Sequence, residues 1–583
     1  MEMNDLAKKR HTLAHLLAAA VIEKYPDTKL TLGPAIDTGF YYDMEFSKPI
    51  SDADLAEIEK SMKKLLPKWD EFTHREVSAD EAGKIFAGNP YKLELIEEIA
   101  AKNEPITLYI CAGFEDLCRG GHSDNPSREI SPDSFKLDKV AGAYWRGDEK
   151  NKMLTRIYGL AFENKAELDA YAEQQIEAAK RDHRKIGKEL NLFTFSELVG
   201  AGLPLWTPRG HKLREALTDR LWSISKKYGY EKVTIPHIAK LALYETSGHA
   251  AKFKEEFFYV RGAQSGDEFV FKPMNCPHHT QIYASAPRSY RDLPVRLNEL
   301  TMMYRDEKPG QLLGLSRVRS ISVDDAHIFC TPDQIKDEVR NIVRTIEEFY
   351  SSLGMYKKGE TFWVSLSVRD PQTPEKYLGT DENWQKAETF LQEISDEFGL
   401  DAKRMPGEAA FYGPKLDFQF KDALGRERQL ATAQIDFVQP ERFGLEYTAK
   451  DGSKQMPVMI HRAIAGSLER FIAIMIEHFA GDFPFWLSPT QVAVIPIKDE
   501  THGDFAKSLH EKLLQNDIRS EFMGGDVGFG KRVRVAKDQK VTFILVIGDK
   551  EMESGKFKLE GVETFENLSI EEILQKFAEL NKI

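Results

Sequence analysis

Cysteine is scarce in this sequence, with four residues in 583: Cys111, Cys118, Cys276 and Cys330. So few thiols exclude a secreted fold held together by disulfides, and two of them stand beside histidines, as in metal or catalytic sites. Long apolar runs are missing as well, since no stretch reaches the roughly 20 apolar residues of a membrane span. Positive charge is not in excess either: the net charge is −13, so any nucleic-acid contact must come from local basic patches.

The N-terminal segment imitates a secretion signal, because basic residues 8–10 precede an apolar run over 13–22. That run contains His15 and passes directly into Glu23 and Lys24. Its apolar residues also fall at helical spacing, which favours an amphipathic helix. We therefore expect a cytoplasmic protein that makes no membrane contact.

The length and the local patterns predict several domains, because 583 residues are too many for one core. Residues 1–160 mix helix and strand signals, and residues 161–192 form a charged helical connection. Residues 193–484 carry strand segments that do not alternate regularly with helices, which favours an antiparallel sheet. Residues 485–583 do alternate, as in a small α/β domain. The predicted fold class is multidomain, α+β and α/β.

Histidine and cysteine pairs mark the first 160 residues. His11 and His15 are four residues apart and share one face of a helix, and Cys118 and His122 repeat that spacing. The two pairs can close a four-ligand zinc site, or they can line a polar pocket that handles water and a hydroxyl. They can also be two unrelated surface pairs, although Asp116 adds a further polar group nearby.

A second set of side chains is spread over the long middle region. Cys276, His327 and His461 would make three ligands and leave a fourth position for a substrate, although their separation in sequence does not show that they meet. In MMYRDEK, an Arg305-x-Glu307 pair within a strand would place both side chains on one face, where one can bind a phosphate and the other a base amine.

Three segments resemble the signature motifs of class II aminoacyl-tRNA synthetases: the TIP that contains Pro236, YRDE, and GSLER with Arg470. KPMNCP, DDAHIFC, AAFYGPKLDF and MIHRAIAGSLERF are similar to the threonyl-tRNA synthetase family in particular, and HTLAHLL, LGPAIDTGFYYD and DLCRGGH resemble its editing domain. These motifs are collinear over nearly the whole chain. The chain is identified as a bacterial-type member without the N-terminal ubiquitin-like module, because HTLAH begins at residue 11.

The resemblance implies an antiparallel-sheet class II catalytic core at 193–484, an α+β editing domain at 1–160 and an α/β anticodon-binding domain at 485–583. It implies that L-threonine and ATP form threonyl-adenylate, that the threonyl group passes to tRNA(Thr), and that mischarged Ser-tRNA(Thr) is hydrolysed. It also implies a homodimer, one Zn²⁺ per subunit in the catalytic domain, and Mg²⁺ with ATP.

The resemblance further implies four groups of site residues. The zinc ligands would be Cys276, His327 and His461. The ATP site, with Arg305 and Arg470 as its catalytic cations, would comprise Arg305, Glu307, Arg317, Gln429, Thr432, Ser467 and Arg470. Threonine would meet Asp325, Tyr412, Lys415 and Gln434. The editing pocket, similar to a zinc site but working without metal, would comprise His11, His15, Tyr42, Asp43, Lys92, Asp116, Cys118 and His122.

The chain also departs from the family pattern. Val323 stands where a glutamine is frequent, and Ile321 where an aromatic residue stacks on adenine. The C-terminal domain lacks the expected Pro-Tyr, but it has a basic run that predicts tRNA contact near the anticodon, unless it is a solvated helix face: Lys531, Arg532, Arg534, Lys537 and Lys540. Two rival functions are a free-standing editing hydrolase on an inert class II fold and a non-enzymatic tRNA-binding paralogue. The intact Arg305, Glu307 and Arg470 argue against both.

Overall fold

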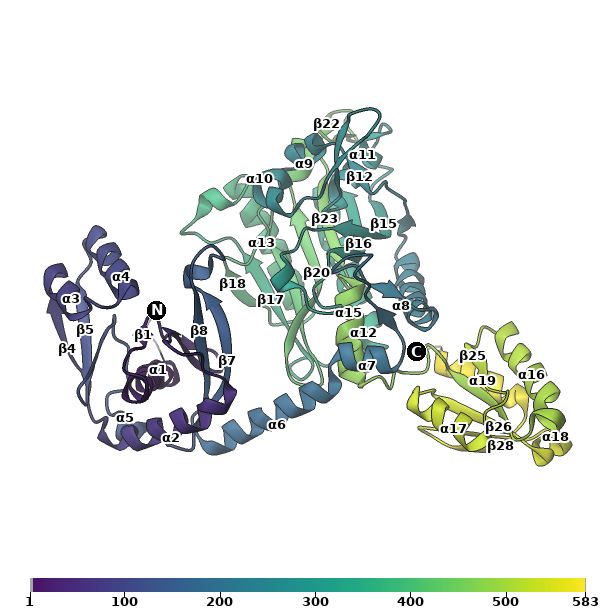
Figure 1. The fold of residues 1–583 in the computed structure, drawn as a ribbon. Helices are drawn as coiled ribbons and strands as arrows, with labels where there is room; N and C mark the ends of the chain where they lie inside the picture. Colours follow the sequence, from purple (N-terminus) through teal and green to yellow (C-terminus); the bar gives the residue numbers. More distant parts are fainter. Residues whose placement is uncertain (1–3, 582–583) are drawn as a thin grey trace. The chain divides into compact units, whose positions relative to one another are not determined.

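A computed structural model describes residues 4–581 of the chain. It divides into two compact units, Met1–Glu177 and Ala178–Ile583, and the division falls inside helix α6 (Lys165–Arg181). Figure 1 shows the course of the chain through both units. No helix among the described residues is long and apolar enough to cross a membrane.

In the first unit, a long helix packs on an antiparallel sheet. Helix α1 (Asp5–Lys24) begins after Asn4, whose side chain accepts a hydrogen bond from Ala7 N at 2.8 Å, as an N-cap does. Its apolar face is buried, with Leu16 and Leu17 fully covered. The sheet order is β1-β3-β8-β7 with β2 on β3, and the strands are β1 Lys29–Leu30, β2 Ala35–Ile36, β3 Gly39–Glu45, β7 Phe135–Tyr144 and β8 Met153–Ala161.

A smaller sheet and its helices complete this unit. The strand order is β4-β5-β6, with β4 Thr73–Val77, β5 Ile106–Cys111 and β6 Phe114–Leu117. The remaining helices are α2 Leu55–Leu65, α3 Ala79–Ile85, α4 Pro90–Ala101 and α5 Pro126–Glu129.

The connection expected as one helix is two helices, α6 and α7 (His183–Glu189), which are separated at Asp182. Asp182 has φ −50° and ψ 119°, and its side chain accepts a hydrogen bond from Arg184 N at 2.8 Å. The sequence contains no glycine or proline at this point, but aspartate competes for backbone N–H groups and so can begin a new helix.

The middle region of the chain, residues 193–484, is built on an eight-stranded sheet of order β11-β15-β16-β23-β20-β19-β17-β18. Its interior pairings are antiparallel, as predicted, whereas the outer pairs β11–β15 and β17–β18 are parallel. The strands are β11 Glu231–Lys232, β15 Val295–Tyr304, β16 Ser320–Cys330, β17 Phe362–Val368, β18 Lys403–Pro406, β19 Lys415–Lys421, β20 Glu427–Asp436 and β23 Val458–Ala463.

Strand alternation gives this sheet two different faces. On β16, Ala326 and Ile328 enter the main hydrophobic core together with helices α12 (Ile335–Ser351) and α15 (Leu468–Phe479). The intervening Asp325 and His327 therefore lie on the opposite side. We call that side the site face, and the other strands contribute to it in the same alternation.

Shorter elements surround the site face. A three-stranded sheet has the order β12-β14-β13, with β12 Ile238–Ala239, β13 Tyr259–Arg261 and β14 Glu268–Phe271. The helices nearby are α9 Leu241–Ser247, α10 His249–Phe253, α11 Cys276–Ala284 and α14 Val438–Arg442. The rest of the region comprises β9 Phe193–Thr194, β10 Leu205–Trp206, α8 Pro208–Lys227, α13 Asp381–Glu397, β21 Tyr447–Thr448 and β22 Lys454–Gln455.

The C-terminal domain has a five-stranded sheet of order β25-β24-β26-β27-β28, with hydrophobic clusters on both sides. Strands β25, β24 and β26 are parallel, as the alternating pattern predicts, and the last two are antiparallel. The elements are β24 Val492–Pro496, α16 Asp499–Gln515, β25 Ser520–Phe522, α17 Phe529–Asp538, β26 Phe543–Ile547, α18 Asp549–Ser554, β27 Phe557–Gly561, β28 Phe565–Leu568 and α19 Ile570–Asn581.

The predicted boundary at 484/485 falls between two cores. Phe485 packs in the C-terminal cluster, whereas Trp486 and Leu487 belong to the main core of the middle region. Trp486 Nε1 also donates to Ser352 O at 3.0 Å. A truncation that leaves the main core intact must therefore fall a few residues later than the composition change indicates.

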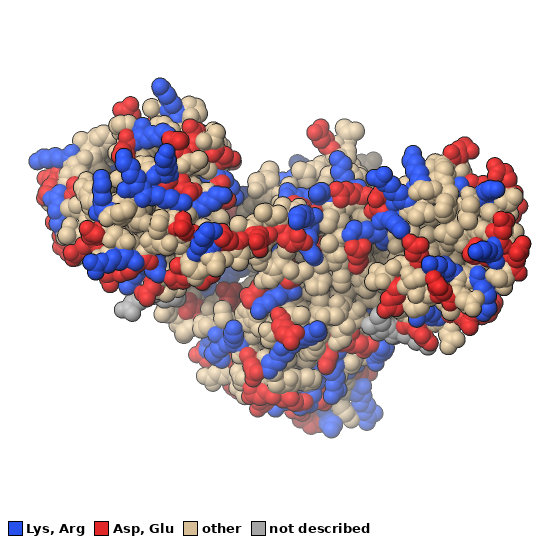
Figure 2. All heavy atoms as spheres, turned by 90° about the horizontal axis from the view of Figure 1, so that it is seen from below, with Lys and Arg blue, Asp and Glu red and all other residues tan. Residues whose placement is uncertain are grey.

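Charged side chains are mixed on the surface. On the face shown in Figure 2, basic and acidic side chains are interspersed rather than gathered by sign. This agrees with the moderate negative net charge of −13.

Candidate functional site

Three possible metal ligands meet on the site face. Cys276 lies at the first position of α11, and His327 and His461 are paired across β16 and β23. All three are buried, and one ligand atom from each lies within 4.8 Å of the others. Burial raises the pKa of the Cys276 thiol, an effect that a bound cation opposes.

Both imidazoles are oriented by another side chain. His327 Nδ1 lies 2.8 Å from His279 Nδ1, and His461 Nε2 lies 2.8 Å from Asp436 Oδ2. This leaves Nε2 of His327 and Nδ1 of His461 as the nitrogens that can bind a metal. One thiol and two oriented imidazoles fit zinc, which accepts sulfur and nitrogen ligands and leaves a fourth position open in catalytic sites.

His279 also indicates where the protons lie. Its Nε2 is 3.8 Å from Glu299 Oε2, and these two buried atoms form no hydrogen bond within the described residues. Glu299 Oε1 accepts from Ile235 N at 2.9 Å. A carboxylate attracts the proton of His279 to Nε2, so His327 donates from Nδ1 and keeps its Nε2 lone pair for a metal.

The predicted threonine-site residues surround this trio. Asp325 Oδ2 accepts from Asn275 Nδ2 at 3.0 Å. The Tyr412 hydroxyl donates to Gln434 Oε1 at 2.8 Å, and its ring stacks on His461 with 4.7 Å between centroids. Lys415 and Gln434 are paired across β19 and β20, and Lys415 Nζ lies 2.9 Å from Asp417 Oδ2.

A neighbouring cavity of about 410 Å³ collects most of the predicted ATP residues. The prediction that Arg305 and Glu307 lie in a strand is wrong, because β15 ends at Tyr304. Both residues follow it in an irregular segment. Glu307 Oε2 accepts from Arg317 Nη2 at 2.8 Å. The lining residues are Met303, Arg305, Glu307, Ser316, Arg317, Val318, Ile321, Val323, Ser467 and Arg470.

The cavity has a positive interior. Burial lowers the pKa of Arg470, and the nearby guanidinium groups of Arg428 and Arg317 add to this effect. Like charges held together in this way suit a polyanion. The departures Ile321 and Val323 lie among the lining residues, so they change the apolar wall and leave the arginines in place.

Gln429 and Thr432 are not among the residues that line this cavity. They donate to the same oxygen, Asp417 Oδ1, at 2.8 and 2.7 Å. Asp417 was not predicted as a site residue, although it stands in the quoted segment AAFYGPKLDF.

The sequence reasoning also missed two basic groups. His249 lies with Nε2 3.8 Å from Cys276 Sγ and Nδ1 2.8 Å from Ser247 Oγ. Burial lowers the pKa of Lys272 to about 8, and its Nζ donates to Thr301 Oγ1 at 2.9 Å. Lys272 is the first residue of KPMNCP, so the family motif could have indicated it. His249 lies in none of the motifs named above.

In the first unit, a cavity of about 370 Å³ is lined by His11, His15, Tyr42, Lys92, Asp116 and Cys118. His122 stands beside it, because its Nε2 lies 3.3 Å from Cys118 Sγ. One ligand atom from each of His11, His15, Cys118 and His122 lies within 4.8 Å of the others. The two pairs therefore meet, and the interpretation as unrelated surface pairs is wrong.

A buried acid–base group forms the polar wall of this cavity. Lys92 is 1% exposed, and its Nζ lies 2.5 Å from Asp116 Oδ1. The Tyr42 hydroxyl donates to Asp116 Oδ2 at 2.5 Å. Burial lowers the pKa of His122 to about 2 and raises that of Cys118 to about 12, so both groups are neutral near pH 7.

Asp43 is the one predicted editing residue that is turned away. Its carboxylate accepts from Arg156 Nε at 2.6 Å and Nη2 at 2.8 Å across the β3–β8 pair, and it is not among the residues that line the cavity. Tyr42 and Asp43 are consecutive in a strand, so their side chains point to opposite faces and only one can reach the cavity.

The five basic residues predicted to contact tRNA in the C-terminal domain do not share one environment. Arg532 is buried and donates to Val527 O at 2.7 Å and Pro496 O at 3.1 Å, so it is an internal structural residue. Lys537 and Lys540 form ion pairs with Glu560 and Asp482. The prediction of one continuous tRNA-binding run is therefore corrected. Its two exposed cations within residues 4–581 that remain are Lys531 and Arg534, and Arg534 forms only a longer ion pair, with Asp538 on the same helix at 3.8 Å.

Comparisons with known proteins match two family models to the second unit, one to the region of the eight-stranded sheet and one to the C-terminal domain. Residues 256–479 match the family of tRNA synthetase class II core domains (G, H, P, S and T), and residues 491–580 match the anticodon binding domain family.

Full-length relatives are similar along almost the whole chain. The threonine–tRNA ligase of Gloeobacter violaceus is 47% identical, and the match covers 98% of this chain and 91% of that protein. The threonine–tRNA ligase of Porphyromonas gingivalis is 48% identical over 93% of this chain and 82% of its own length. A crystal structure of the RNA binding domain of threonyl-tRNA synthetase from Cryptosporidium parvum Iowa II has a TM-score of 0.63 and 37% identity, and covers 69% of this chain and 98% of that one.

Proposed function

The chain belongs to the threonine–tRNA ligase family, and from that premise we propose which of its residues carry out each part of the reaction. It is an aminoacyl-tRNA synthetase whose partners are ATP, threonine and tRNA. The threonine carboxylate attacks the α-phosphate of ATP and displaces pyrophosphate, which gives threonyl-adenylate. A terminal ribose hydroxyl of tRNA(Thr) then takes the threonyl group, and AMP is released. We place the enzyme in the cytoplasm as a homodimer through the segment around Pro236, because that class II motif normally builds a dimer interface.

The observation that carries the choice of amino acid is the meeting of Cys276, His327 and His461 beside Asp325. These three side chains would hold one zinc ion per subunit, and the bound ion would supply Lewis-acid coordination for the amino and hydroxyl groups of threonine. Asp325 accepts a hydrogen bond from the threonine hydroxyl. Valine has the same shape without that hydroxyl, so Asp325 keeps its hydrogen bond from Asn275 but receives none from the substrate. Such a polar mismatch lowers the rate with valine by ~10⁴-fold or more.

The arginines of the neighbouring cavity bind ATP, which the enzyme uses with Mg²⁺. Arg305 holds the α-phosphate, Arg470 the γ-phosphate, and Arg317 adds a further phosphate contact. Glu307 accepts from the adenine amine, and Ser467 completes the wall. Positioning and neutralisation of charge account for this step, and no protein nucleophile is required.

Serine requires a separate defence. It keeps both polar groups of threonine and lacks one methyl, which is worth roughly 1–3 kcal/mol or about 10–200-fold. We assign the cavity of the first unit to hydrolysis of Ser-tRNA(Thr), with selection by exclusion of the threonine methyl. Neutral His11, His15 and Cys118 position a water, and Lys92 stabilises the developing charge.

The alternative for this cavity is a structural zinc bound by His11, His15, Cys118 and His122. The ion pair between Lys92 and Asp116 favours hydrolysis, because a closed structural site needs neither a buried lysine nor an open cavity beside it. Chelation separates the two: a structural zinc site unfolds when its metal is removed, and an editing pocket stays folded.

Amino-acid-dependent ATP–pyrophosphate exchange across all twenty amino acids tests the main proposal. We expect the fastest exchange with threonine, a rate about 10–200-fold lower with serine, and ~10⁴-fold or lower with valine. If none of the twenty amino acids supported exchange, the result would favour an editing hydrolase or a non-enzymatic paralogue. A preference for an amino acid other than threonine would overturn the assignment of the zinc trio.

A further inference from the structure

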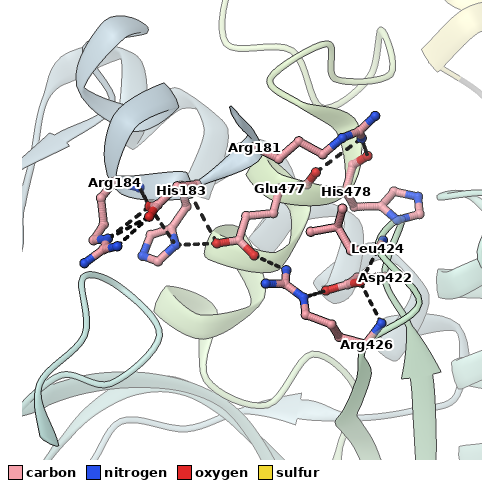
Figure 3. A network of polar contacts seen from close by, with 9 residues as sticks. Arg181, His183, Arg184, Asp422, Leu424, Arg426, Glu477 and His478 are labelled. Carbon is pink, nitrogen blue, oxygen red and sulfur yellow. Dashed lines mark hydrogen bonds and ion pairs between the residues drawn. The ribbon is translucent and has the colours of Figure 1, made fainter. Parts of the chain in front are cut away.

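The first residue of helix α7 joins two parts of the catalytic core. His183 is 3% exposed on its side chain, and its Nδ1 lies 2.7 Å from Glu477 Oε1 near the end of α15 (Figure 3). On the other side of the ring, Nε2 accepts a hydrogen bond from Leu315 N at 3.0 Å. The connecting segment is therefore bonded both to the helix that carries Arg470 and to the loop that carries Arg317.

These two contacts require one form of the imidazole. A backbone N–H can only donate, so Nε2 must present its lone pair, and Nδ1 must carry the proton that it donates to Glu477. Burial alone raises the pKa of Glu477, but hydrogen bonds from His183 and Arg426 outweigh it and leave the pKa below its ordinary value. An ionised Glu477 thus holds His183 in the tautomer that can bind Leu315 N.

Glu477 is itself fixed from several sides (Figure 3). Arg426 pairs with its other oxygen and donates from Nε to Asp422 Oδ2 at 2.7 Å, which ties it to the β19–β20 hairpin. Arg181 Nη1 donates to His478 O at 3.0 Å, at the end of the same helix. The carboxylate that orients His183 therefore has little freedom to move.

This cluster is not a metal site, although Asp182, His183 and Glu477 lie close enough together to hold an ion. Asp182 already accepts from Arg184, Glu477 accepts from Arg426, and both imidazole nitrogens are in use. Every one of these ligand atoms is already engaged in a hydrogen bond or ion pair, and the proton on His183 Nδ1 stands between the imidazole and Glu477, where an ion would have to be.

The loop that contacts His183 is a tight turn. Leu313 N donates to Arg317 O at 3.2 Å, and Arg317 N donates to Leu313 O at 3.3 Å. The side chain of Leu315, at its tip, is fully buried in the main core. Gly314 has φ +50°, and a Cβ there would lie 2.3 Å from His183 Nε2, so the turn packs directly on the imidazole.

We propose that His183 is a positioning residue of the nucleotide cavity: oriented by Glu477, it fixes the turn 313–317 and with it the place of Arg317. The two walls of the cavity, Arg317 on the turn and Arg470 on α15, are held in register through this one ring. The inference rests on the proposed use of that cavity for ATP. It concerns ATP alone, because none of the contacts of His183 reaches the zinc trio or Asp325.

Two variants separate the two bonds of the ring. The amide of Gln reaches the place of Nε2, so His183→Gln keeps an acceptor for Leu315 N. The shorter amide of Asn reaches the place of Nδ1, so His183→Asn keeps a donor for Glu477 and loses the bond to the turn. Lys185→Ala, on the exposed side of the same helix, is the matched control.

Threonine-dependent ATP–pyrophosphate exchange is measured for each variant over a range of ATP and of threonine. We expect His183→Asn to raise the KM for ATP about tenfold, as for one lost buried hydrogen bond, with the KM for threonine unchanged. His183→Gln and the control should stay within about threefold of the wild type. Gly314→Ala, which pushes the turn off an intact His183, should reproduce the effect of His183→Asn and serves if that variant folds poorly.

The inference is overturned if His183→Asn and Gly314→Ala both leave the KM for ATP unchanged, or if the KM values for ATP and threonine rise together. In either case the wild-type chain would still catalyse threonine-dependent exchange, so the proposed function would stand. Failure of the proposed function is a different result, because the wild-type chain itself would then support no exchange.

Discussion

Cys276 and Cys330 are both buried thiols of the catalytic sheet region, but they serve opposite faces of it. Cys276 meets His327 and His461 on the site face, whereas Cys330, on the same strand as His327, packs in the main core. Residue type and burial alone do not distinguish them. The neighbours across the sheet do, and these follow from strand alternation.

This difference gives a matched test of the zinc assignment. Cys276→Ala should lose the zinc and the threonine-dependent exchange, because two imidazoles without the thiolate bind zinc far more weakly. Cys330→Ala should keep both and lose only about 1 kcal/mol of folding free energy. Metal analysis of the purified proteins decides, and full zinc occupancy in Cys276→Ala would contradict the assignment.

At the editing cavity, Lys92→Met should leave threonine charging intact and let Ser-tRNA(Thr) accumulate, since it removes the cation that stabilises the developing charge. Because Asp116 would then be a buried charge without its partner, Lys92→Met should also be compared with the double variant Lys92→Met/Asp116→Asn. The measurement is deacylation of Ser-tRNA(Thr). Wild-type rates in both folded variants would rule the editing role out.

Acid should destabilise the first unit through His122. Its pKa is about 2 in the folded chain and 6.5 as a free group, so the unfolded chain binds the extra proton between these values. The stability that neutral His122 contributes is complete above pH 6.5 and is lost as the pH falls towards 2, about 2 kcal/mol of it by pH 5. Pulse proteolysis in urea at pH 7.5 and 5 measures it, and His122→Gln should reduce the pH dependence.

Most site residues could be predicted from the motifs, whereas their contacts could not. The motifs predicted Arg305, Glu307 and Arg470 as site residues, and all three line one cavity, but the strand predicted to carry Arg305 and Glu307 ends at Tyr304. The sequence reasoning missed His183 because a histidine in a charged helical segment looks like a solvent-facing residue. Its two partners, Glu477 and Leu315, are far along the chain and only the fold brings them together.

Helix α17 shows the same limit for an element. The density of basic residues predicted a tRNA-binding surface, but one side of that helix faces the interior of the domain, where Arg532 binds backbone carbonyls and Asp499. A run of basic residues does not show whether each side chain points to the solvent or to the interior. That depends on which side of the helix packs on the sheet.

For this helix we predict two separate effects. Lys531→Ala/Arg534→Ala should weaken tRNA binding and reduce the slope of log K against log[salt] by about 2, because each exposed cation neutralises one phosphate. Arg532→Met should destabilise the domain by about 1–3 kcal/mol, since it leaves buried carbonyl oxygens without a hydrogen-bond donor. Binding titrations at several salt concentrations measure the first, and an unchanged slope would mean that α17 does not touch the tRNA.

For the whole molecule, the division of labour can be tested by shortening the chain. Residues 1–488 should retain threonine-dependent exchange and show a raised KM for tRNA, because they keep Trp486 and Leu487 in the catalytic core and lose the C-terminal domain. A chain ending at 484 should be less stable, since the core then lacks both side chains. Undiminished aminoacylation by residues 1–488 would contradict the proposed role of that domain.

The alternation along β16 also restricts how such a protein can vary. Deleting one residue before Asp325 would turn Ala326 and Ile328 towards the substrate and drive Asp325 and His327 into an apolar core, and it would do so for the rest of the strand at once. The central strands thus behave like a reading frame: single replacements alter one contact, whereas a shift by one residue exchanges inside for outside. Changes in length between relatives should therefore be confined to the turns that join these strands.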